Sequence, residues 1–321
     1  MILWGVSMMR NEEDIVEAFV RHNLAILDGL LVVDHNSTDA TSAILASLCA
    51  ERLPLVVMRN DSPGYLQAEV TTTAARQVFA RTPADFVFPL DADEFLKVGD
   101  RASLEAFLAT LPPDTHARFD WPTYAPAPGA PLADVVSIAR GARRIVDLPV
   151  VGKVAVARSF ASIPGAYIGQ GNHEIFVGTD PRVAPRLPMV RAPASMCVAH
   201  LPARNAARHA IKFGVRRLAR IAAGRDYPPA SNAYRAFAGL KAGEAPTIND
   251  LLRPHVDGFI AADDGPEPAD RPTIDDPFIR EIALRYTRPP VEDPLPVVLA
   301  AVDGLTRRLA AYRRDGRLRP R

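Results

Sequence analysis

The chain has 321 residues, enough for one large α/β domain or two smaller ones. Hydrophobic residues make up 48% and charged residues 23% of the chain, a composition that excludes wholesale disorder, collagen and coiled coil. The 38 Lys and Arg residues nearly balance the 37 Asp and Glu, giving a net charge of +1. This balance excludes a chain-wide nucleic-acid-binding surface, so we expect no nucleic-acid partner and only local charged sites.

The cysteine pattern and the apolar runs indicate a cytoplasmic protein. Cys49 and Cys197 are far apart and form no CxxC pair, so we expect neither a disulfide framework nor a zinc cluster. No apolar run reaches the roughly 18 residues that span a bilayer. The opening segment Met1–Met9 is too short for a signal peptide and is better interpreted as a first strand.

Residues 2 to about 96 alternate short apolar runs with longer amphipathic stretches, which predicts βαβ units and a mostly parallel sheet. Because the carboxyl ends of parallel strands meet at one edge of a sheet, we expect a ligand site there. The predicted strands are Ile2–Met8, Gly29–Asp34, Leu53–Arg59 and Asp85–Leu90, and the predicted helices are Glu12–Leu27, Ala40–Glu51 and Gln67–Ala80.

Beyond residue 96 the pattern is less regular, which indicates an insertion followed by a mainly helical region. We expect a catalytic domain over residues 1–215 and a mainly helical C-terminal extension over 216–321. The predicted elements are a helix at Leu104–Leu111, strands at His116–Trp121, Val150–Ala157 and Met196–His200, a basic helix at Ala206–Ala223, loops at Pro122–Pro131 and Asp263–Asp276, and an amphipathic segment at Val297–Arg314.

Two carboxylates follow the fourth predicted strand at positions i and i+2. In extended geometry Asp91 and Asp93 leave the same face of the chain. Together they could hold a hard divalent cation, Mn²⁺ or Mg²⁺, that neutralises charge on a diphosphate leaving group. The alternative interpretation is a solvated acidic turn.

A second polar segment follows the second predicted strand. Asp34 lies at the strand end, where it could accept a hydrogen bond from a nucleobase or ribose. Ser37, Thr38 and Asp39 follow it, and capping of the next helix is the alternative role for these three.

Three segments together resemble the family 2-like glycosyltransferases with the GT-A fold: Val6–Asp14, Val32–Thr41 and Leu90–Phe95. The resemblance is strong over residues 1 to about 100 and weaker to about 215. It implies a Rossmann-like α/β fold and a nucleotide-sugar donor linked to UDP or GDP.

The resemblance also implies roles for individual residues. Asp34 would lie near the nucleoside, and Asp91 and Asp93 would lie at the metal and diphosphate. Asn11, Glu12 and His35 belong to the same motifs and are further candidates for donor binding. His35 is a departure, because many relatives have a second acid at that position.

Two later segments resemble the downstream part of bacterial relatives: Gly171–Glu174 and His200–Asn205. A neutral imidazole is a suitable third metal ligand. We expect His200, at the end of an apolar strand, to fill this role, with His173 as the competitor and a structural histidine as the alternative.

Basic side chains near these strands are candidates for holding a diphosphate. These are Lys153, Arg204 and Lys212. They suit the role because arginine binds phosphate bidentately and lysine supplies a point charge. The basic residues from Arg208 to Arg220 are interpreted mainly as a solvated helix face. Arg204 is the exception that we assign to donor binding, together with Lys153.

An inverting sugar transfer requires a carboxylate that takes the proton of the acceptor hydroxyl. Glu174 and Asp120 are candidates by type and location, and Glu94 is a third that could instead organise the metal site. Trp121 could give an acceptor sugar an aromatic platform, although a core position is the alternative.

Taken together, these features predict a metal-dependent inverting glycosyltransferase whose acceptor is a glycan, a lipid-linked sugar or a small molecule. The alternatives are a non-catalytic nucleotide-sugar-binding or scaffold protein and, with less support, a DxD phosphatase. The terminal arginines could contact the inner face of a membrane, or form a solvated tail: they are Arg307, Arg308, Arg313, Arg314, Arg317, Arg319 and Arg321.

Overall fold

A computed structural model describes residues 1–62, 64–127, 134–149, 151–180, 182–222, 249, 252, 266–279, 281–288 and 295–314. The strands are β1 Leu3–Met9, β2 Gly29–Asp34, β3 Leu55–Arg59, β4 Phe86–Pro89, β5 Glu94–Lys97, β6 His116–Asp120, β7 Tyr124–Ala125, β8 Arg143–Ile145, β9 Gly152–Ala157, β10 Ala166–Ile168, β11 Ile175–Val177, β12 Met189–Arg191, β13 Cys197–His200 and β14 Thr273–Asp275. The α-helices are α1 Val16–Leu24, α2 Thr41–Ala50, α3 Gln67–Arg81, α4 Arg101–Ala109, α5 Val135–Arg140, α6 Ala206–Ala222 and α9 Leu295–Arg314, and the 3₁₀ helices are η1 Arg158–Ser162, η2 Gln170–Asn172 and η3 Pro268–Asp270.

The central sheet has a parallel half and an antiparallel extension. Its strand order is β3-β2-β1-β4-β9-β6-β13-β5, with β12 beside β6. The strands β3, β2, β1 and β4 are parallel, whereas β9 runs antiparallel to both β4 and β6. The predicted α/β class with a Rossmann-like parallel half is therefore confirmed.

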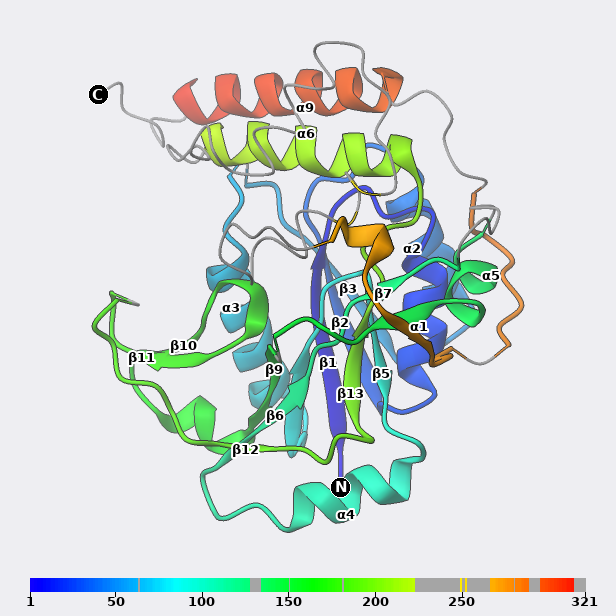
Figure 1. The fold of residues 1–321 in the computed structure, drawn as a ribbon. Helices are drawn as coiled ribbons and strands as arrows, with labels where there is room; N and C mark the ends of the chain where they lie inside the picture. The colour runs from blue at the N-terminus through cyan, green and yellow to red at the C-terminus, as the bar shows by residue number, and fades with distance from the viewer. Residues whose placement is uncertain are drawn as a thin grey trace.

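Helices cover both faces of the parallel half (Figure 1). The fully buried strand β2 points alternate apolar side chains to these two faces. On one face Leu30 and Val32 of β2 pack in the same core as α1 and α2. On the other face Leu31 and Val33 pack with α3. The strands are thus fixed in register, and their carboxyl ends lie at one edge.

Helices α6 and α9 lie side by side across that edge (Figure 1). They pack through Ile211 and Val215 of α6 and Ala301 of α9. The domain division expected at 215/216 falls inside α6, which is continuous from Ala206 to Ala222. No helix in the described ranges is long and apolar enough to span a bilayer.

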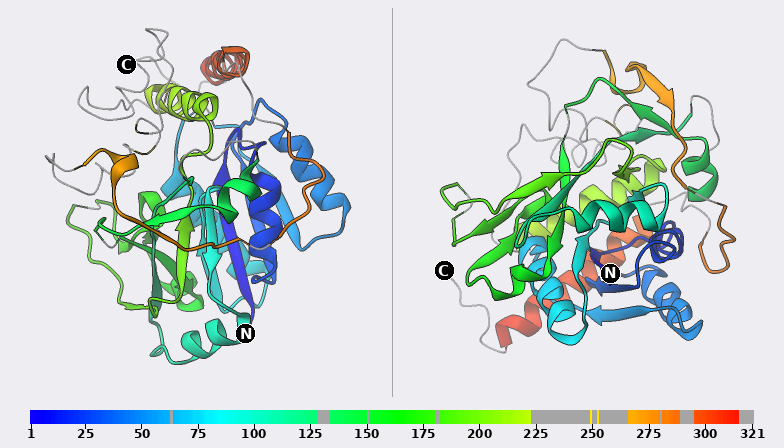
Figure 2. Two further views of the ribbon diagram at one scale, coloured as in Figure 1. Left: turned by 45° about the vertical axis from the view of Figure 1, so that its right-hand side comes forward. Right: turned by 90° about the horizontal axis from the view of Figure 1, so that it is seen from below.

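The C-terminal region returns to the sheet domain as an extended strap, here residues 273–279 and 281–288. Strand β14 pairs with β8, and the orange segment lies beside β7 and β8 in Figures 1 and 2. Phe278 packs against Phe95 with 5.4 Å between ring centroids. This part of the predicted helical extension is therefore neither helical nor separate, and α9 is the long helix of the described C-terminal residues.

The structure also differs from the predicted elements in the middle of the chain. Helix α1 begins at Val16 instead of Glu12, because residues 12–14 form polar contacts described below. The short strands β5, β7, β8, β10, β11, β12 and β14 and the helix α5 were not predicted. Cys49 and Cys197 are both free, as expected.

Glu17 of α1 ties the strap to the domain. Its side chain is fully buried, and its carboxylate accepts hydrogen bonds from the backbone N–H groups of Arg285, Tyr286 and Thr287 at 2.8–2.9 Å. It also pairs with Arg21. Although burial raises it, these donors hold the pKa of Glu17 below its ordinary value.

We expect Glu17→Gln to lower the free energy of unfolding by about 2 kcal/mol at pH 7. Because the folded-state pKa of Glu17 is lowered, its contribution is complete above the unfolded-state pKa and is lost as the pH falls through the folded-state value. Urea unfolding of wild type and variant at pH 7 and pH 3.5 measures this difference, which should shrink at the lower pH. A difference that does not change with pH would contradict the assignment.

Candidate functional site

A cavity of about 210 Å³ lies at the carboxyl edge of the parallel strands. The residues that follow β1, β2 and β4 line it, together with one face of α6 and parts of the loops near β9 and β10. The strand ends therefore meet as the sequence analysis expected. The side chains that carry the argument are Arg10, Asn11, Glu12, His35, Gln67, Asp91, Asp93, Trp121, Lys153, His173, His200 and Lys212.

Asp91 is held in place by a buried cluster. Its Oδ1 accepts from Gln67 Nε2 at 2.7 Å, and its Oδ2 contacts Lys153 Nζ at 3.2 Å. Lys153 Nζ also contacts Glu94 Oε1 at 2.5 Å and donates to the carbonyl of Gly171 at 2.7 Å. A lysine ammonium has three N–H donors, and this cluster uses all of them. Lys153 therefore orients Asp91 instead of offering a free charge to phosphate.

Asp93 lies deeper in the same cavity, with only 2% of its surface exposed. Its Oδ2 contacts Lys212 Nζ of α6 and lies 3.8 Å from His200 Nε2. Burial raises the pKa of Asp93, but Lys212 and the neighbouring cationic groups outweigh this effect and lower it. Asp93 is therefore ionised, and Lys212 is a cavity cation and not part of a solvated helix face as predicted.

Both candidate histidines line the cavity and contact Trp121. The indole stacks on His200 with ring centroids 4.1 Å apart and meets His173 edge-on at 5.2 Å. Burial lowers the pKa of His200 to about 3 and that of His173 to about 4, so both rings are neutral at physiological pH. A neutral ring keeps a lone pair that can coordinate a metal.

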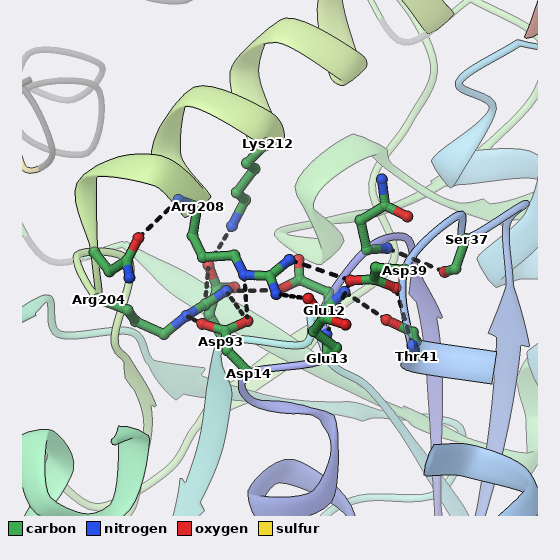
Figure 3. A network of polar contacts seen from close by, with 12 residues as sticks. Glu12, Glu13, Asp14, Ser37, Asp39, Thr41, Asp93, Arg204, Arg208 and Lys212 are labelled. Atoms are coloured by element: carbon green, nitrogen blue, oxygen red, sulfur yellow. Dashed lines mark hydrogen bonds and ion pairs between the residues drawn. The ribbon is translucent and has the colours of Figure 1, made fainter. Parts of the chain in front are cut away.

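The loops after β1 and β2 are locked together by hydrogen bonds (Figure 3). The backbone N–H of Asn11 donates to Ser37 Oγ at 3.0 Å, and the backbone N–H of Glu12 donates to Thr41 Oγ1 at 2.8 Å. Asn11 Oδ1 accepts from the backbone N–H of Thr38 at 2.7 Å. Ala40 makes no side-chain cap at the start of α2, but Asp39 Oδ1 accepts from the backbone N–H of Thr41, the first residue of the helix, at 2.9 Å. Asp39 therefore has the capping role of the alternative interpretation, whereas Ser37 joins the two loops.

Arg204 and Arg208 anchor the β1 loop from the other side (Figure 3). Arg204 donates to Glu12 Oε2 at 2.6 Å and to Asp14 Oδ2 at 2.9 Å, and it is 5% exposed. Arg208 pairs with Glu13. Arg204 does not line the cavity, so we correct the expectation that it grips the diphosphate: its guanidinium neutralises buried carboxylates of this chain.

Asp34 also differs from its expected role. Its Oδ1 accepts from the backbone N–H of Ser37 at 3.0 Å, and its Oδ2 accepts from Ser42 Oγ. Asp34 does not line the cavity, whereas the next residue, His35, does. His35 Nε2 contacts the carbonyl of Ser62 at 2.9 Å, an arrangement in which Nε2 is the donor and Nδ1 keeps a lone pair.

The three candidate bases have different surroundings. Glu94 is fully buried and accepts from Trp121 Nε1 at 2.8 Å and the backbone N–H of Asp91 at 2.9 Å, so it organises the site. Glu174 lies 3.6 Å from Arg186 Nη1 and lines neither cavity described here. Asp120 lines a second cavity and pairs bidentately with Arg191 at 2.7 Å.

This second cavity has a volume of about 430 Å³ and shares Trp121 with the first. Its walls include Pro122, Ile145 and Leu148. Asp276 of the C-terminal strap is also part of the lining. The indole of Trp121 therefore lies between the two cavities. This position excludes a purely core role, and whether Trp121 supports an acceptor sugar stays a prediction.

Sequence reasoning did not assign Arg10 or Gln67 to the site, and it named Lys212 as a candidate for holding diphosphate but then interpreted it as part of a solvated helix face. The signal for Lys212 was available: Arg208, Lys212 and Arg216 recur four residues apart along one side of α6, beside Ile211 and Val215. That spacing places cations next to an apolar stripe and predicts a face that packs on something charged. Arg10 lies within the quoted motif but was not singled out.

The chemistry of the side chains suits a divalent cation, because two carboxylates and a neutral imidazole line the same cavity. In the arrangement seen here, lysine ammonium groups contact Asp91 and Asp93. Within the described part of the chain, no cluster of three or more His, Cys, Asp or Glu side chains is arranged to hold a metal. A cation would therefore have to displace Lys212 from Asp93.

No family model matches the chain, and no curated protein matches it. Similar solved structures include residues 1–349 of TarS from S. aureus, 14% identical over 74% of this chain and 71% of that chain, with a TM-score of 0.36. The mannosyltransferase PcManGT from Pyrobaculum calidifontis, in complex with GDP-Man and Mn²⁺, is 14% identical over 98% and 79%, with a TM-score of 0.37. Glucosyl-3-phosphoglycerate synthase from Mycobacterium tuberculosis, with Mn²⁺, UDP and phosphoglyceric acid, is 16% identical over 51% and 58%, with a TM-score of 0.27. Similarities of this size do not assign a function, which has to come from the site.

Of the terminal arginines considered for membrane contact, Arg307 is exposed and pairs with Asp303 at 2.9 Å. Arg308 of α9 is half-buried, and its charge lowers the pKa of both Arg10 and His35. Arg317, Arg319 and Arg321 and the side chains of Arg313 and Arg314 lie outside the described residues.

Proposed function

We propose that this chain is a glycosyltransferase that moves a sugar from a nucleoside-diphosphate donor to a carbohydrate or lipid-linked acceptor in the cytoplasm. The observation that supports it best is one cavity, at the carboxyl edge of three parallel strands, into which both carboxylates of a DxD pair and a strand-end histidine face. That edge is where open α/β sheets bind nucleotides.

Several residues of this chain have roles in donor binding under this proposal. Lys153 and Glu94 hold Asp91 against the cavity, and the locked loops after β1 and β2 fix the position of His35. The lone pair of His35 Nδ1 accepts from a hydroxyl or amine of the nucleoside. Asp34 acts on binding only through the loop that it holds.

A Mn²⁺ or Mg²⁺ ion would be held by Asp91 and Asp93 with His200 or His173, and it would neutralise the leaving diphosphate. Lys212, which contacts Asp93 here, would then be released from it, and its ammonium would be available to the same phosphates. A chelator should reduce transfer, and calorimetric titration with Mn²⁺ alone should detect binding in wild type but not in Asp93→Asn. Full activity after dialysis against chelator would contradict metal dependence.

We place the acceptor in the second cavity, across Trp121 from the donor. Asp120 lines that cavity and is the candidate base with the best access to an acceptor. In an inverting displacement the acceptor oxygen bonds to the anomeric carbon as the bond to the diphosphate breaks, and the hydroxyl proton passes to Asp120. Glu94, buried and saturated with hydrogen bonds, is better suited to positioning than to proton transfer.

Asp120→Asn should lower kcat by about 10²- to 10⁴-fold while the donor affinity stays unchanged. Because the Asp120 carboxylate binds Arg191 on a partly exposed surface, the fold should tolerate the change. A transfer assay and a separate donor titration check both halves. Wild-type kcat in this variant would contradict the role of Asp120 and return Glu174 to consideration.

The function itself is tested by incubating the protein with UDP- and GDP-linked sugars, Mn²⁺ and a panel of acceptor sugars. We expect a glycosylated product and release of nucleoside diphosphate. Donor binding without transfer or hydrolysis across the panel would instead support a non-catalytic nucleotide-sugar-binding protein.

A further inference from the structure

Arg10, the residue that follows β1, is an unusual cation in the first cavity. Its Nε, Nη1 and Nη2 atoms are all buried, and none has a hydrogen-bond partner. Within the described part of the chain it makes no ion pair. Three other cations at this edge differ, because Lys153, Arg204 and Lys212 each contact at least one carboxylate.

A buried guanidinium without a hydrogen bond or ion pair to any described residue is a costly arrangement, because the charge has lost its water and direct contacts do not replace it. Burial, followed by the like charge of Arg308 on α9, lowers the pKa of Arg10 to about 10 against the opposing effect of Asp34. Arg10 is still charged at neutral pH. An anion that entered the cavity would therefore remove a cost that the empty site carries.

The charge pattern indicates which anion fits. Asp91 and Asp93 line the cavity with the ammonium groups of Lys153 and Lys212 on their carboxylates, whereas Arg10 lines it without an ion pair to any described residue and has Arg308 nearby. Two like-charged arginines favour a group with more than one negative charge over a single carboxylate. The planar fork of a guanidinium binds two oxygens of one phosphate group.

We propose that Arg10 binds a phosphate group of the ligand directly and does so without a divalent cation. The inference rests on the proposed function only for the identity of the ligand as a nucleoside diphosphate. It adds a residue that the sequence motifs did not single out, and it divides the cavity into a cation-binding wall and a phosphate-binding wall.

The test uses inorganic pyrophosphate in the presence of EDTA, so that no metal contributes. In wild-type protein, pyrophosphate should raise the unfolding temperature and bind in calorimetry. Arg10→Met should have an unfolding temperature at least as high as wild type without ligand, because the uncompensated charge is gone, and should bind pyrophosphate at least tenfold more weakly. Arg59→Met is the matched control, since Arg59 is exposed and pairs with Asp61, and it should change neither quantity.

Arg10→Lys keeps the charge without the fork and resolves the case in which Arg10→Met is unstable. It should fold and bind pyrophosphate with an affinity below that of wild type. Wild-type pyrophosphate affinity in either Arg10 variant would overturn the inference, and so would the absence of pyrophosphate binding in wild type.

The two proposals fail separately. Equal binding of UDP or GDP with Mn²⁺ in wild type and in Arg10→Met would overturn the role of Arg10 and leave the glycosyltransferase proposal standing. Pyrophosphate binding that depends on Arg10, in a protein that binds no nucleoside diphosphate, would support the inference and contradict the proposed function.

Discussion

Asp93→Asn is expected to abolish sugar transfer, with kcat/KM reduced by at least about 10³-fold, while the protein stays folded. Asp93 is 2% exposed and contacts Lys212, with His200 at 3.8 Å. The amide keeps the shape of the side chain but removes the charge that a cation would need. Lys212 is 27% exposed, so its ammonium can turn to solvent instead of being left buried without a partner.

The comparison variant for this prediction is Asp61→Asn. Asp61 is exposed and pairs with Arg59 on the surface, so the same chemical change should leave transfer and stability as in wild type. Circular dichroism and thermal unfolding show whether each variant is folded. Transfer by folded Asp93→Asn at the wild-type rate would remove Asp93 from the mechanism.

Arg204→Met is expected to be the most destabilising substitution at the site, at about 3–5 kcal/mol. The change leaves Glu12 and Asp14 buried without their counter-ion, and both are 7% exposed. Burial lowers the pKa of Arg204, but these carboxylates outweigh that effect and raise it above its ordinary value. Arg204 therefore stays protonated. The loop after β1 should loosen, and the loop after β2 with it.

Urea unfolding measures this cost, and Arg182→Met is the control. Arg182 is 85% exposed and contacts Asp180 through two nitrogens, so it has a similar ion pair without burial. Its loss should change the free energy of unfolding by less than about 1 kcal/mol. A cost for Arg204→Met as small as that of Arg182→Met would mean that the network in Figure 3 does not hold the loop.

The parallel half of the fold was predictable because its strands are continuous apolar runs. The run Leu30–Val33 predicts a buried strand, and in the structure its side chains alternate between the two cores that the strand separates. The position of Asp91 and Asp93 followed directly, since they come straight after such a run. The short strand β5 was missed because Glu94–Lys97 is defined by antiparallel pairing with β13, about a hundred residues later.

The roles of charged residues were harder to predict, because a sequence does not show which partner a charge will meet. Arg204 was expected to face phosphate, yet Glu12 and Asp14, about 190 residues earlier, take its guanidinium. Lys153 was expected to be free, yet Glu94 and Gly171 use its donors. Arg10 is the converse: that no described residue bonds to its guanidinium becomes visible only in the folded structure.

The central claim is that the first cavity binds a nucleoside diphosphate through Asp91 and Asp93. Calorimetric titration of UDP and GDP with Mn²⁺ into wild type and into the Asp91→Asn, Asp93→Asn double variant tests it most directly. The claim predicts one binding site per chain in wild type and at least a hundredfold weaker binding in the double variant. No binding of either nucleotide to wild type, or equal binding to both proteins, would contradict it.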